Sequence, residues 1–246
     1  MKRRLFLASS LASLGLTACG PVKDSLTNGP FRNVLHSAER LNQSVIGTHG
    51  MAREYADADV DREFRVNGLD TPADSTYDGL RKGGFRDYRL VVDGLAERPQ
   101  RLTLAELRVA GDRTQITRHD CVEGWSAIGK WRGVPLATIV AMAQPKPDAR
   151  YVVFHCFDRD QSGQSYYESL GLHQAAHPQT LLALDLNDKP LDAAHGAPVR
   201  LRIPTQLGYK SAKWVSRIEL VANLKGTFGG TGGYWEDYGY EWYAGI

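Results

Sequence analysis

The residues of this chain whose types could do chemistry gather around one cysteine, Cys121. Arg118, His119 and Lys130 lie close to it in sequence, and positive neighbours favour the thiolate electrostatically. A reactive thiol or a metal-ligating thiolate is therefore one prediction. The other is a buried, inert cysteine, which is among the commonest core residues. The local sequence leaves both interpretations open.

Cys156 and two histidines add two further possible roles for Cys121. Cys121 and Cys156 could pair as a disulfide in an oxidising compartment, which would exclude a working thiol. Alternatively, Cys121 is a nucleophile with His119 or His155 as its base. His155 and Cys156 are neighbours in the run YVVFHCF, so in a strand they point to opposite sides and only one can face a site.

A second polar group follows further along the chain, where cationic and hydroxyl side chains come close together. A buried phosphate requires cationic partners and N–H donors, and this span offers both. Arginine suits a forked contact to phosphate, whereas lysine acts as a point charge. The alternative is a solvated basic loop. The residues concerned are Arg200, Tyr209, Lys210, Ser211 and Lys213.

The segment CVEGWSAIGKWRGVPL, which starts at Cys121, resembles the molybdenum-ligating segment of the sulfite oxidase family of molybdopterin enzymes. The block GAPVRLRIPTQLGYKSAKW, Gly196–Trp214, resembles that family's cofactor-phosphate region. REFRVNGLDTP, Arg62–Pro72, resembles the segment that covers the pterin. The likeness is strongest to the small bacterial branch that includes catalytic subunits of periplasmic methionine sulfoxide reductases.

The resemblance implies a sulfite oxidase-type fold of class α+β, with mixed β-sheets and short helices in a single domain. It implies a molybdenum–molybdopterin cofactor (Mo-MPT), with Cys121 as metal ligand and catalytic residue, because soft sulfur donors select a thiophilic metal. His195 stands where the family carries Asn, and it can still donate a hydrogen bond. The cofactor-binding residues expected from the resemblance are Phe64, Arg65, Asn67, Cys156, His195, Arg200, Lys210, Ser211 and Lys213.

The implied reaction is transfer of an oxygen atom to or from a small oxo substrate, and the branch favours a reductase of sulfoxide-like compounds. Because no Cys-x-x-Cys-His heme motif occurs, electrons are expected to pass through an external electron-transfer protein, either a cytochrome or a membrane heme subunit. One alternative is an exported, non-catalytic lipoprotein that binds a partner through its aromatic tail, Gly229–Ile246. The other is the thiol enzyme described above. The tail could equally pack on its own domain.

The composition indicates which classes of partner to exclude, and the N-terminus indicates the compartment. Charged residues at 24% and hydrophobic ones at 42% are typical of a globular domain, and a net charge of +2 without a basic stripe argues against a nucleic-acid partner. Lys2–Arg4 precede an apolar run, Leu5–Ala18, that is shorter than the about 20 residues of a membrane span, which indicates an export signal. RRLFL resembles the twin-arginine signal. Leu16–Cys19 resembles a lipobox, so we expect a periplasmic protein anchored to the membrane by lipid at Cys19.

The chain is thus expected to divide into an export signal (1–18), a flexible tether (19–50, with a short helix around Phe31–Leu41) and the cofactor domain with its tail (51–246). Period-two alternation before Cys121 predicts a strand that ends there, and Gly133 and Pro135 are expected to break the chain afterwards. Helices are expected at the capping box Thr103–Glu106 and over Leu136–Ala143. Further strands are expected at 88–93, 151–157, 198–204 and 215–221, and a hairpin around Asn187–Lys189.

Overall fold

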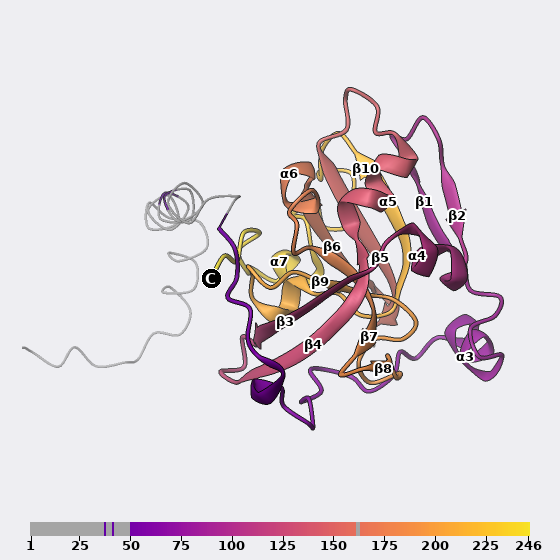
Figure 1. Cartoon of the computed structure of the whole chain (residues 1–246). Coiled ribbons are helices and arrows are strands. Elements are labelled where there is room, and N and C mark those ends of the chain that lie inside the picture. The colour runs from indigo at the N-terminus through magenta and orange to yellow at the C-terminus, as the bar shows by residue number, and fades with distance from the viewer. Residues whose placement is uncertain (1–36, 38–40, 42–49, 161–162) are drawn as a thin grey trace, which may run out of the picture. The chain divides into compact units, whose positions relative to one another are not determined.

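Two β-sheets of five strands each carry the fold (Figure 1). The computed structural model describes Ser37, Leu41, residues 50–160 and residues 163–246. The predicted export signal, Cys19 and most of the predicted tether lie outside these residues. The described domain belongs to one compact unit, Leu41–Ile246.

The first sheet has the strand order β2-β1-β10-β5-β6. β1 and β10 run parallel, whereas the other neighbours are antiparallel, so the sheet is mixed as expected. Its outermost position beside β5 is taken by β6, a strand that the sequence patterns had not indicated. The strands are β1 (Leu90–Gly94), β2 (Gln100–Leu102), β5 (Tyr151–Arg159), β6 (Ser165–Gly171) and β10 (Val215–Val221).

The second sheet has the order β3-β4-β7-β8, with β9 also paired to β7. The β3–β4 hairpin is the longest pairing, running from Arg113 opposite Gly133 to Asp120 opposite Ser126. The predicted strand before Cys121 and the predicted hairpin around Asn187–Lys189 are both confirmed. The strands are β3 (Arg113–Asp120), β4 (Ser126–Pro135), β7 (Leu181–Leu186), β8 (Lys189–Pro190) and β9 (Arg200–Arg202).

The expected break at Gly133 and Pro135 is wrong, because β4 continues through both residues. At Gly133 the register against β7 shifts, and a Cβ there would overlap the Leu182 carbonyl. The glycine therefore allows two strands to approach closely, a role that a single sequence does not distinguish from a turn. Pro135 is the last residue of the strand, a position that needs no ladder N–H.

The helices of the described region are short. The capping box is present, since the Thr103 hydroxyl accepts from the Glu106 N–H while the Glu106 carboxylate accepts from the Thr103 N–H. The helix over Leu136–Ala143 has the bounds that the pattern predicted. None of the described helices has the length and apolarity that a membrane crossing requires. They are η1 (Asp57–Asp59), α3 (Ser75–Lys82), α4 (Leu104–Ala110), α5 (Leu136–Ala143), α6 (Leu172–Ala175), η2 (Gly208–Lys210) and α7 (Tyr234–Asp237).

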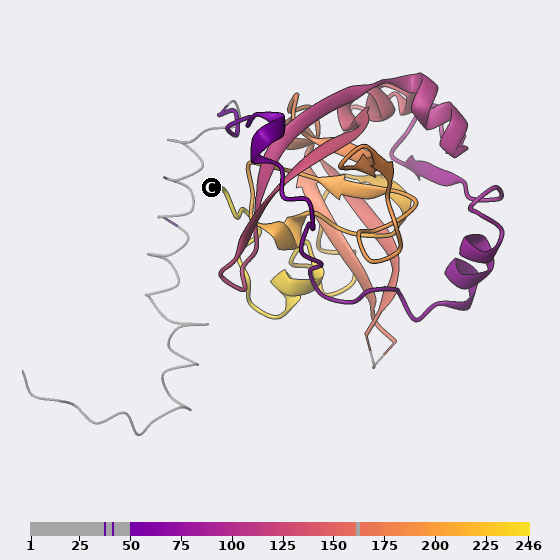
Figure 2. The ribbon, with the colours of Figure 1, turned by 60° about the horizontal axis from the view of Figure 1, so that its bottom comes forward.

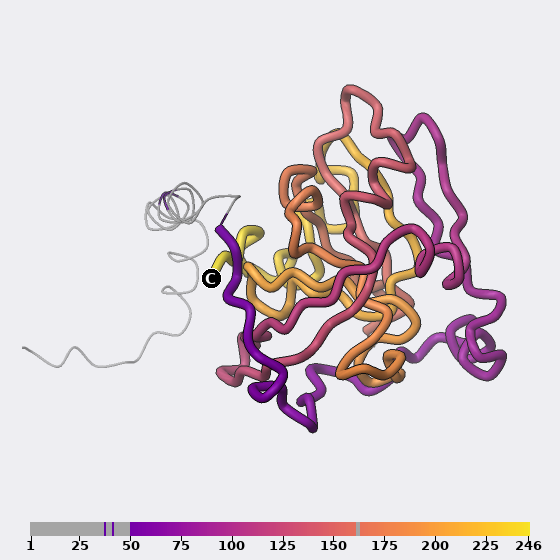
Figure 3. The backbone as a smooth tube through the Cα atoms, in the orientation of Figure 1, coloured from indigo at the N-terminus to yellow at the C-terminus, as the bar shows by residue number. Residues whose placement is uncertain are grey.

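The main hydrophobic core combines side chains of both sheets with those of α5, for example Val152 and Ile218 from the first sheet and Leu182 and Leu201 from the second. A smaller core forms around Trp131 and Phe64. The trace shows the stretch after residue 50 and the C-terminal end close to each other (Figure 3). The stretch after residue 50 bridges β3 through Glu54 and Thr117, and the C-terminal end bridges Gln206 through Gly245.

Candidate active site

A cavity of about 350 Å³ lies beside the turn of the β3–β4 hairpin. Figures 1 and 2 show the yellow C-terminal segment next to the end of this hairpin, and both contribute to the wall. The predicted cysteine segment and the predicted phosphate loop, far apart in sequence, therefore meet at one cavity. Its main lining residues are Asn67, Leu69, Cys121, Glu123, Asp158, Tyr166, Tyr209, Ser211, Lys213, Tyr234, Trp235 and Tyr240.

Cys121 is the first residue after β3 and sits in a tight turn. Its N–H donates to the Trp125 carbonyl at 2.9 Å, and its carbonyl accepts from Gly124 at 3.0 Å. Gly124 has φ +87°, a conformation that favours glycine. The hairpin ladder and this turn together hold the thiol at the cavity wall in a half-buried position.

The thiol is less acidic than its sequence neighbours had indicated. Burial, with the nearby Glu123 carboxylate, raises the pKa of Cys121 above its usual value. Arg118 and Lys130 do not compensate, because each is engaged by aspartates. The expectation that positive neighbours favour the thiolate is therefore wrong. A coordinating metal deprotonates a thiol outright, so metal ligation fits this site better than free nucleophilic chemistry.

The structure weakens both alternatives to metal ligation, namely a disulfide and a nucleophilic thiol. Cys121 and Cys156 are free, so the predicted alternative of a disulfide is wrong. His155 lines a separate cavity and binds Glu219 at 2.9 Å. His119 is fully buried, and burial lowers its pKa well below the usual value. Within the described residues, neither ring nitrogen of His119 has a hydrogen-bond partner, Cys121 included.

A cluster of buried cations lies behind the cavity. Arg200 donates from Nη2 to the Asn67 side-chain oxygen at 2.9 Å and from Nη1 to the His195 carbonyl at 3.2 Å. Lys213 donates to the carbonyls of Asn67 at 2.7 Å and Ala194 at 3.0 Å. These hydrogen bonds join the 64–69 segment to the predicted phosphate loop. The predicted residues that take part are Asn67, His195, Arg200 and Lys213. Burial, and then Arg200, lower the pKa of Lys213 to about 7.

Arg202 belongs to the same cluster, although the sequence interpretation had not singled it out. It is fully buried beside Arg200, and both guanidinium groups lie over the Trp131 ring, at 5.2 and 5.4 Å. Burial lowers the pKa of Arg200 to about 10 and of Arg202 to about 9, so both stay charged at neutral pH. The detectable signal was the spacing: arginines two apart in a strand share one face.

The remaining predicted residues of the 64–69 segment and His195 surround this cluster. His195 donates from Nε2 to the Phe64 carbonyl at 3.0 Å, and its other ring nitrogen lies 2.7 Å from an Asp192 oxygen. Phe64 packs edge-on against His195 and Trp131. The Arg65 guanidinium lies 4.9 Å over the Trp125 ring, next to the cysteine turn. These residues support the site from behind, while Asn67 and Ser211 reach the cavity wall.

The structure places Cys156 and Lys210 elsewhere. Cys156 is buried in the main core and is not among the lining residues. Lys210 is fully buried, with its ammonium between the carboxylates of Glu168 and Glu236. The expectation that Lys210 binds the cofactor is corrected accordingly, because its charge is already satisfied by two anions. His155 and Cys156 do point to opposite sides of β5, as alternation requires.

The donor set fits an anionic, sulfur-ligated cofactor. Buried N–H groups without partners are rare, yet within the described region Arg200 Nε, Arg202 Nε and Arg202 Nη1 have none. In the part of the chain that the structure describes, Arg200, Arg202 and Lys213 have no carboxylate contact, and Cys121 is the one cysteine of the cavity wall, which Lys213 also lines. No cluster of three or more His, Cys, Asp or Glu side chains suited to an all-protein metal site occurs among the described residues. Molybdopterin, which brings a phosphate and two sulfurs of its own, matches both features.

Comparisons with known proteins agree. The model of the oxidoreductase molybdopterin binding domain matches residues 75–228. The chain is 36% identical over 250 residues to a putative protein-methionine-sulfoxide reductase subunit, YedZ1, of Azospira oryzae, covering 99% of this chain and 87% of the relative. It is 37% identical over 146 residues to the protein-methionine-sulfoxide reductase catalytic subunit MsrP of Gluconobacter oxydans, covering 54% of this chain and 47% of that protein.

Among solved structures, the sulfane dehydrogenase SoxCD from Paracoccus pantotrophus superposes with a TM-score of 0.50 and 25% identity, covering 56% of this chain and 39% of that one. The region that the family model matches, residues 75–228, contains the cysteine turn, the cation cluster and both sheets. The chain therefore belongs to the oxidoreductase molybdopterin-binding domain family and is a molybdenum-dependent oxidoreductase with a sulfite oxidase-type fold.

Proposed function

We propose that this protein reduces sulfoxides, with methionine sulfoxide in polypeptides as its substrate class. The observation that carries the proposal is the charge of the cavity wall. Glu123, Asp158 and Asp160 line it together with Arg159 and Lys213, and Lys213 is already bonded to backbone carbonyls. The wall therefore has no excess of positive charge to select an anionic substrate such as sulfite, and it suits a neutral sulfoxide. The names of the two relatives point to the same chemistry.

The balanced reaction consumes one sulfoxide, two electrons and two protons, and yields one thioether and one water. When bound, the cofactor supplies two-electron oxygen-atom transfer. Cys121 would ligate the metal, while Arg200, Arg202 and Lys213 would hold the anionic end of the pterin. Burial raises the pKa of Asp158, whose Oδ1 is buried without a hydrogen-bond partner in the described region. Asp158 is therefore placed to hold a proton at the cavity wall.

The test uses holoenzyme purified from molybdenum-replete cells, with a reduced dye as electron donor. We expect turnover of methionine sulfoxide, free or in a peptide, and little oxidation of sulfite with an acceptor dye. Sulfite oxidation that exceeds sulfoxide reduction would overturn the proposed direction and substrate. Enzyme that binds molybdenum yet turns over neither compound would restrict the conclusion to the family.

We further propose that the protein is exported and receives its electrons from an external electron-transfer protein, either a cytochrome or a membrane heme subunit. The basic start with RRLFL, the sequence LTAC that ends at Cys19 and the description of both relatives as subunits support this proposal. Cys19→Ala should move the protein from the membrane fraction to the soluble periplasmic fraction. Unchanged membrane association of Cys19→Ala would contradict the lipid anchor.

A further inference from the structure

The C-terminal strap, residues 229–246, builds one side of the candidate active site. Tyr234, Trp235 and Tyr240 line the cavity opposite the cysteine turn. Their rings form a series: Tyr166 stacks on Tyr234 at 5.4 Å, Tyr234 meets Trp235 at 5.3 Å and Trp235 stacks on Tyr240 at 5.4 Å. The wall is thus continuous from β6 to the strap.

The strap cannot hold this shape by itself. Its helix, α7, has four residues and no side-chain cap, and so short a helix is not stable alone. Tyr209 donates from its hydroxyl to the Glu241 carbonyl at 2.6 Å, and Trp242 donates from Nε1 to the Ser169 hydroxyl at 2.8 Å. Bonds to β6 and to the loop around η2 therefore set its position.

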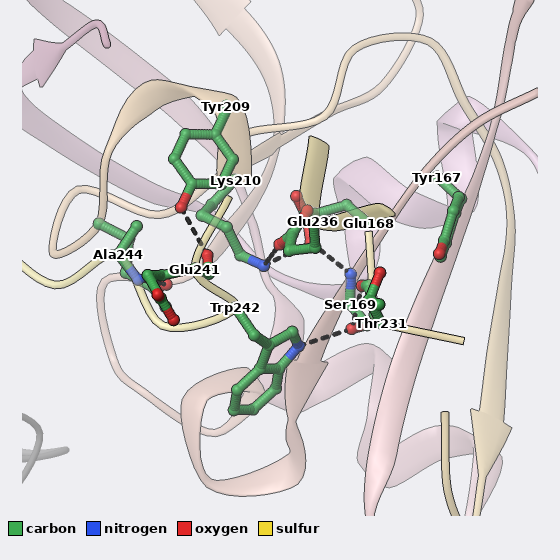
Figure 4. A network of polar contacts seen from close by, with 12 residues as sticks. Tyr167, Glu168, Ser169, Tyr209, Lys210, Thr231, Glu236, Glu241, Trp242 and Ala244 are labelled. Carbon is green, nitrogen blue, oxygen red and sulfur yellow. Dashed lines mark hydrogen bonds and ion pairs between the residues drawn. The ribbon is translucent and has the colours of Figure 1, made fainter. Parts of the chain in front are cut away.

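The central fastening is the ion triad of Glu168, Lys210 and Glu236, whose side chains are 0%, 0% and 1% exposed. Figure 4 shows the Lys210 amine directed at both carboxylates, with Trp242 reaching Ser169 beside them. Glu168 belongs to β6, Lys210 to η2 and Glu236 to α7. One ammonium thus joins the sheet, the loop behind the cavity and the strap.

The two carboxylates of the triad depend on the Lys210 ammonium for their stabilisation while the strap is closed. Burial raises the pKa of Glu168, while Lys210 acts in the opposite direction. The second oxygens of Glu168 and Glu236 are buried and have no hydrogen-bond partner in the described region, so Lys210 is the cation that stabilises them. A Cβ at position 233 would overlap the Glu236 carboxylate, so Gly233 gives the space that this arrangement needs.

Trp235 directly precedes Glu236, so the position of one determines the position of the other. Successive residues of a helix point about 100° apart, and here Glu236 is buried while Trp235 is 39% exposed at the cavity. Seating Glu236 on Lys210 therefore turns Trp235 toward the cavity. A hydrophobic contact could hold the strap equally firmly but would not define this orientation.

We propose that Lys210, with Glu168 and Glu236, is a positioning residue that keeps the strap closed, so that Tyr234, Trp235 and Tyr240 form the wall on which the sulfoxide-bearing side chain of the substrate packs. Sulfur-containing chains make favourable contacts with aromatic rings. This inference rests on the proposed sulfoxide reductase function for its substrate, but the closure of the strap does not depend on that function. The wall acts on substrates long enough to reach it, and dimethyl sulfoxide is not.

The first arm of the test needs no activity. Limited chymotrypsin digestion of the full chain reports opening of the strap through cleavage at its tyrosines and tryptophans. Lys210→Met leaves two buried carboxyls together and should speed cleavage by about tenfold or more, and Glu236→Gln should do so more weakly. The combined variant Lys210→Met, Glu168→Gln, Glu236→Gln removes every charge and should restore slow cleavage. Lys189→Met, at an exposed lysine, is the matched control.

The second arm uses holoenzyme, with rates expressed per bound molybdenum. Lys210→Met and Glu236→Gln should raise KM for a methionine sulfoxide peptide by about tenfold while kcat changes less than about twofold, because uniform binding is lost. KM for dimethyl sulfoxide should not change. Trp235→Ala should raise KM for the peptide likewise.

Wild-type cleavage rates in Lys210→Met and Glu236→Gln would overturn the fastening role of the triad. Faster cleavage with an unchanged KM for the peptide would overturn the role of the strap as a substrate wall. Wild-type holoenzyme that reduces no sulfoxide would refute the proposed function, and therefore the substrate wall, while the digestion arm still decides the fastening.

Discussion

Cys121 is the residue whose properties depend most on what binds beside it. Burial raises its pKa, which favours the protonated thiol, and the metal ligation that we propose would displace this proton. Cys156 has the same side chain but lies in the main core, where nothing in the described region calls for a thiolate. The two cysteines therefore form a natural comparison.

We predict that Cys121→Ser lowers sulfoxide reduction by more than about 100-fold, since altering even the groups behind metal ligands costs 10–100-fold. Serine is a harder donor than a thiolate. Cys156→Ser should retain substantial activity. The measurement is turnover per bound pterin in both variants. Near-normal turnover of Cys121→Ser would mean that this residue is not the ligand, and equal loss in both variants would mean that the core position matters as much.

The cation cluster gives a second prediction at this scale. Arg200→Ala or Lys213→Ala should give folded protein with little cofactor, because a buried anion loses a charge-assisted partner worth about 2–5 kcal/mol. Occupancy should fall by a factor of tens or more. Released pterin fluorescence per mole of protein is the measurement. Arg132→Ala, at an exposed arginine paired with Asp112, is the control. Full pterin content in both cluster variants would exclude this phosphate site.

At the scale of elements, the β3–β4 hairpin and β7 determine where Cys121 and the cations stand. β4 pairs with both β3 and β7, and β9, which carries Arg200 and Arg202, pairs with β7. The close approach of β4 and β7 at Gly133 thus links the cysteine turn to the cation cluster.

Replacing Gly133 with Ala should destabilise the protein by about 1–3 kcal/mol, because the added methyl overlaps the backbone of Leu182 and Ala183. Gly79→Ala is the matched substitution: its Cβ meets nothing within 4 Å in α3, so it should stabilise by about 0.5–1 kcal/mol. Urea unfolding midpoints of both variants test the pair. A neutral Gly133→Ala would show that the two strands can separate at this point without cost.

At the scale of the whole molecule, folding brings three cations together before any cofactor balances them. Of the three, Lys213 is the one whose lowered pKa lies near neutral pH, since it falls from 10.5 to about 7. Between these values the unfolded chain binds more protons than the folded chain, so the stability of the folded state rises with pH. Below pH 7 both states are protonated and the slope from this group disappears.

Cofactor-free protein should therefore gain up to about 1.4 kcal/mol of unfolding free energy per pH unit from Lys213 between about pH 7 and pH 8.5. Lys213→Met should remove this contribution, while Lys189→Met should keep it. Urea titrations at constant ionic strength provide the comparison. The same slope in Lys213→Met and the parent protein would show that Lys213 titrates normally.

Local sequence signals predicted much of the fold. The alternation before Cys121, the capping box at Thr103 and the apolar run Leu136–Ala143 each act over a few residues, and each prediction is confirmed. The motifs around Cys121 and Arg200 also indicated the family, and the family model and the relatives confirm that membership. The prediction at Gly133 was wrong, because a glycine that allows a neighbouring strand to approach closely cannot be distinguished in a single sequence from a glycine that ends a strand.

What the sequence determined by itself is the set of groups that can act: one thiol, a cluster of cations and an aromatic tail. Tertiary structure alone decided their states. Burial raises the pKa of Cys121, and the positive charges of Arg118 and Lys130 do not offset this effect because both side chains form ion pairs with aspartates. The tertiary fold also pairs Lys210 with two carboxylates, one from β6 and one from α7. It places the aromatic tail at the cavity. Charge, burial and partners are set by residues far apart in the chain, and no local pattern encodes them.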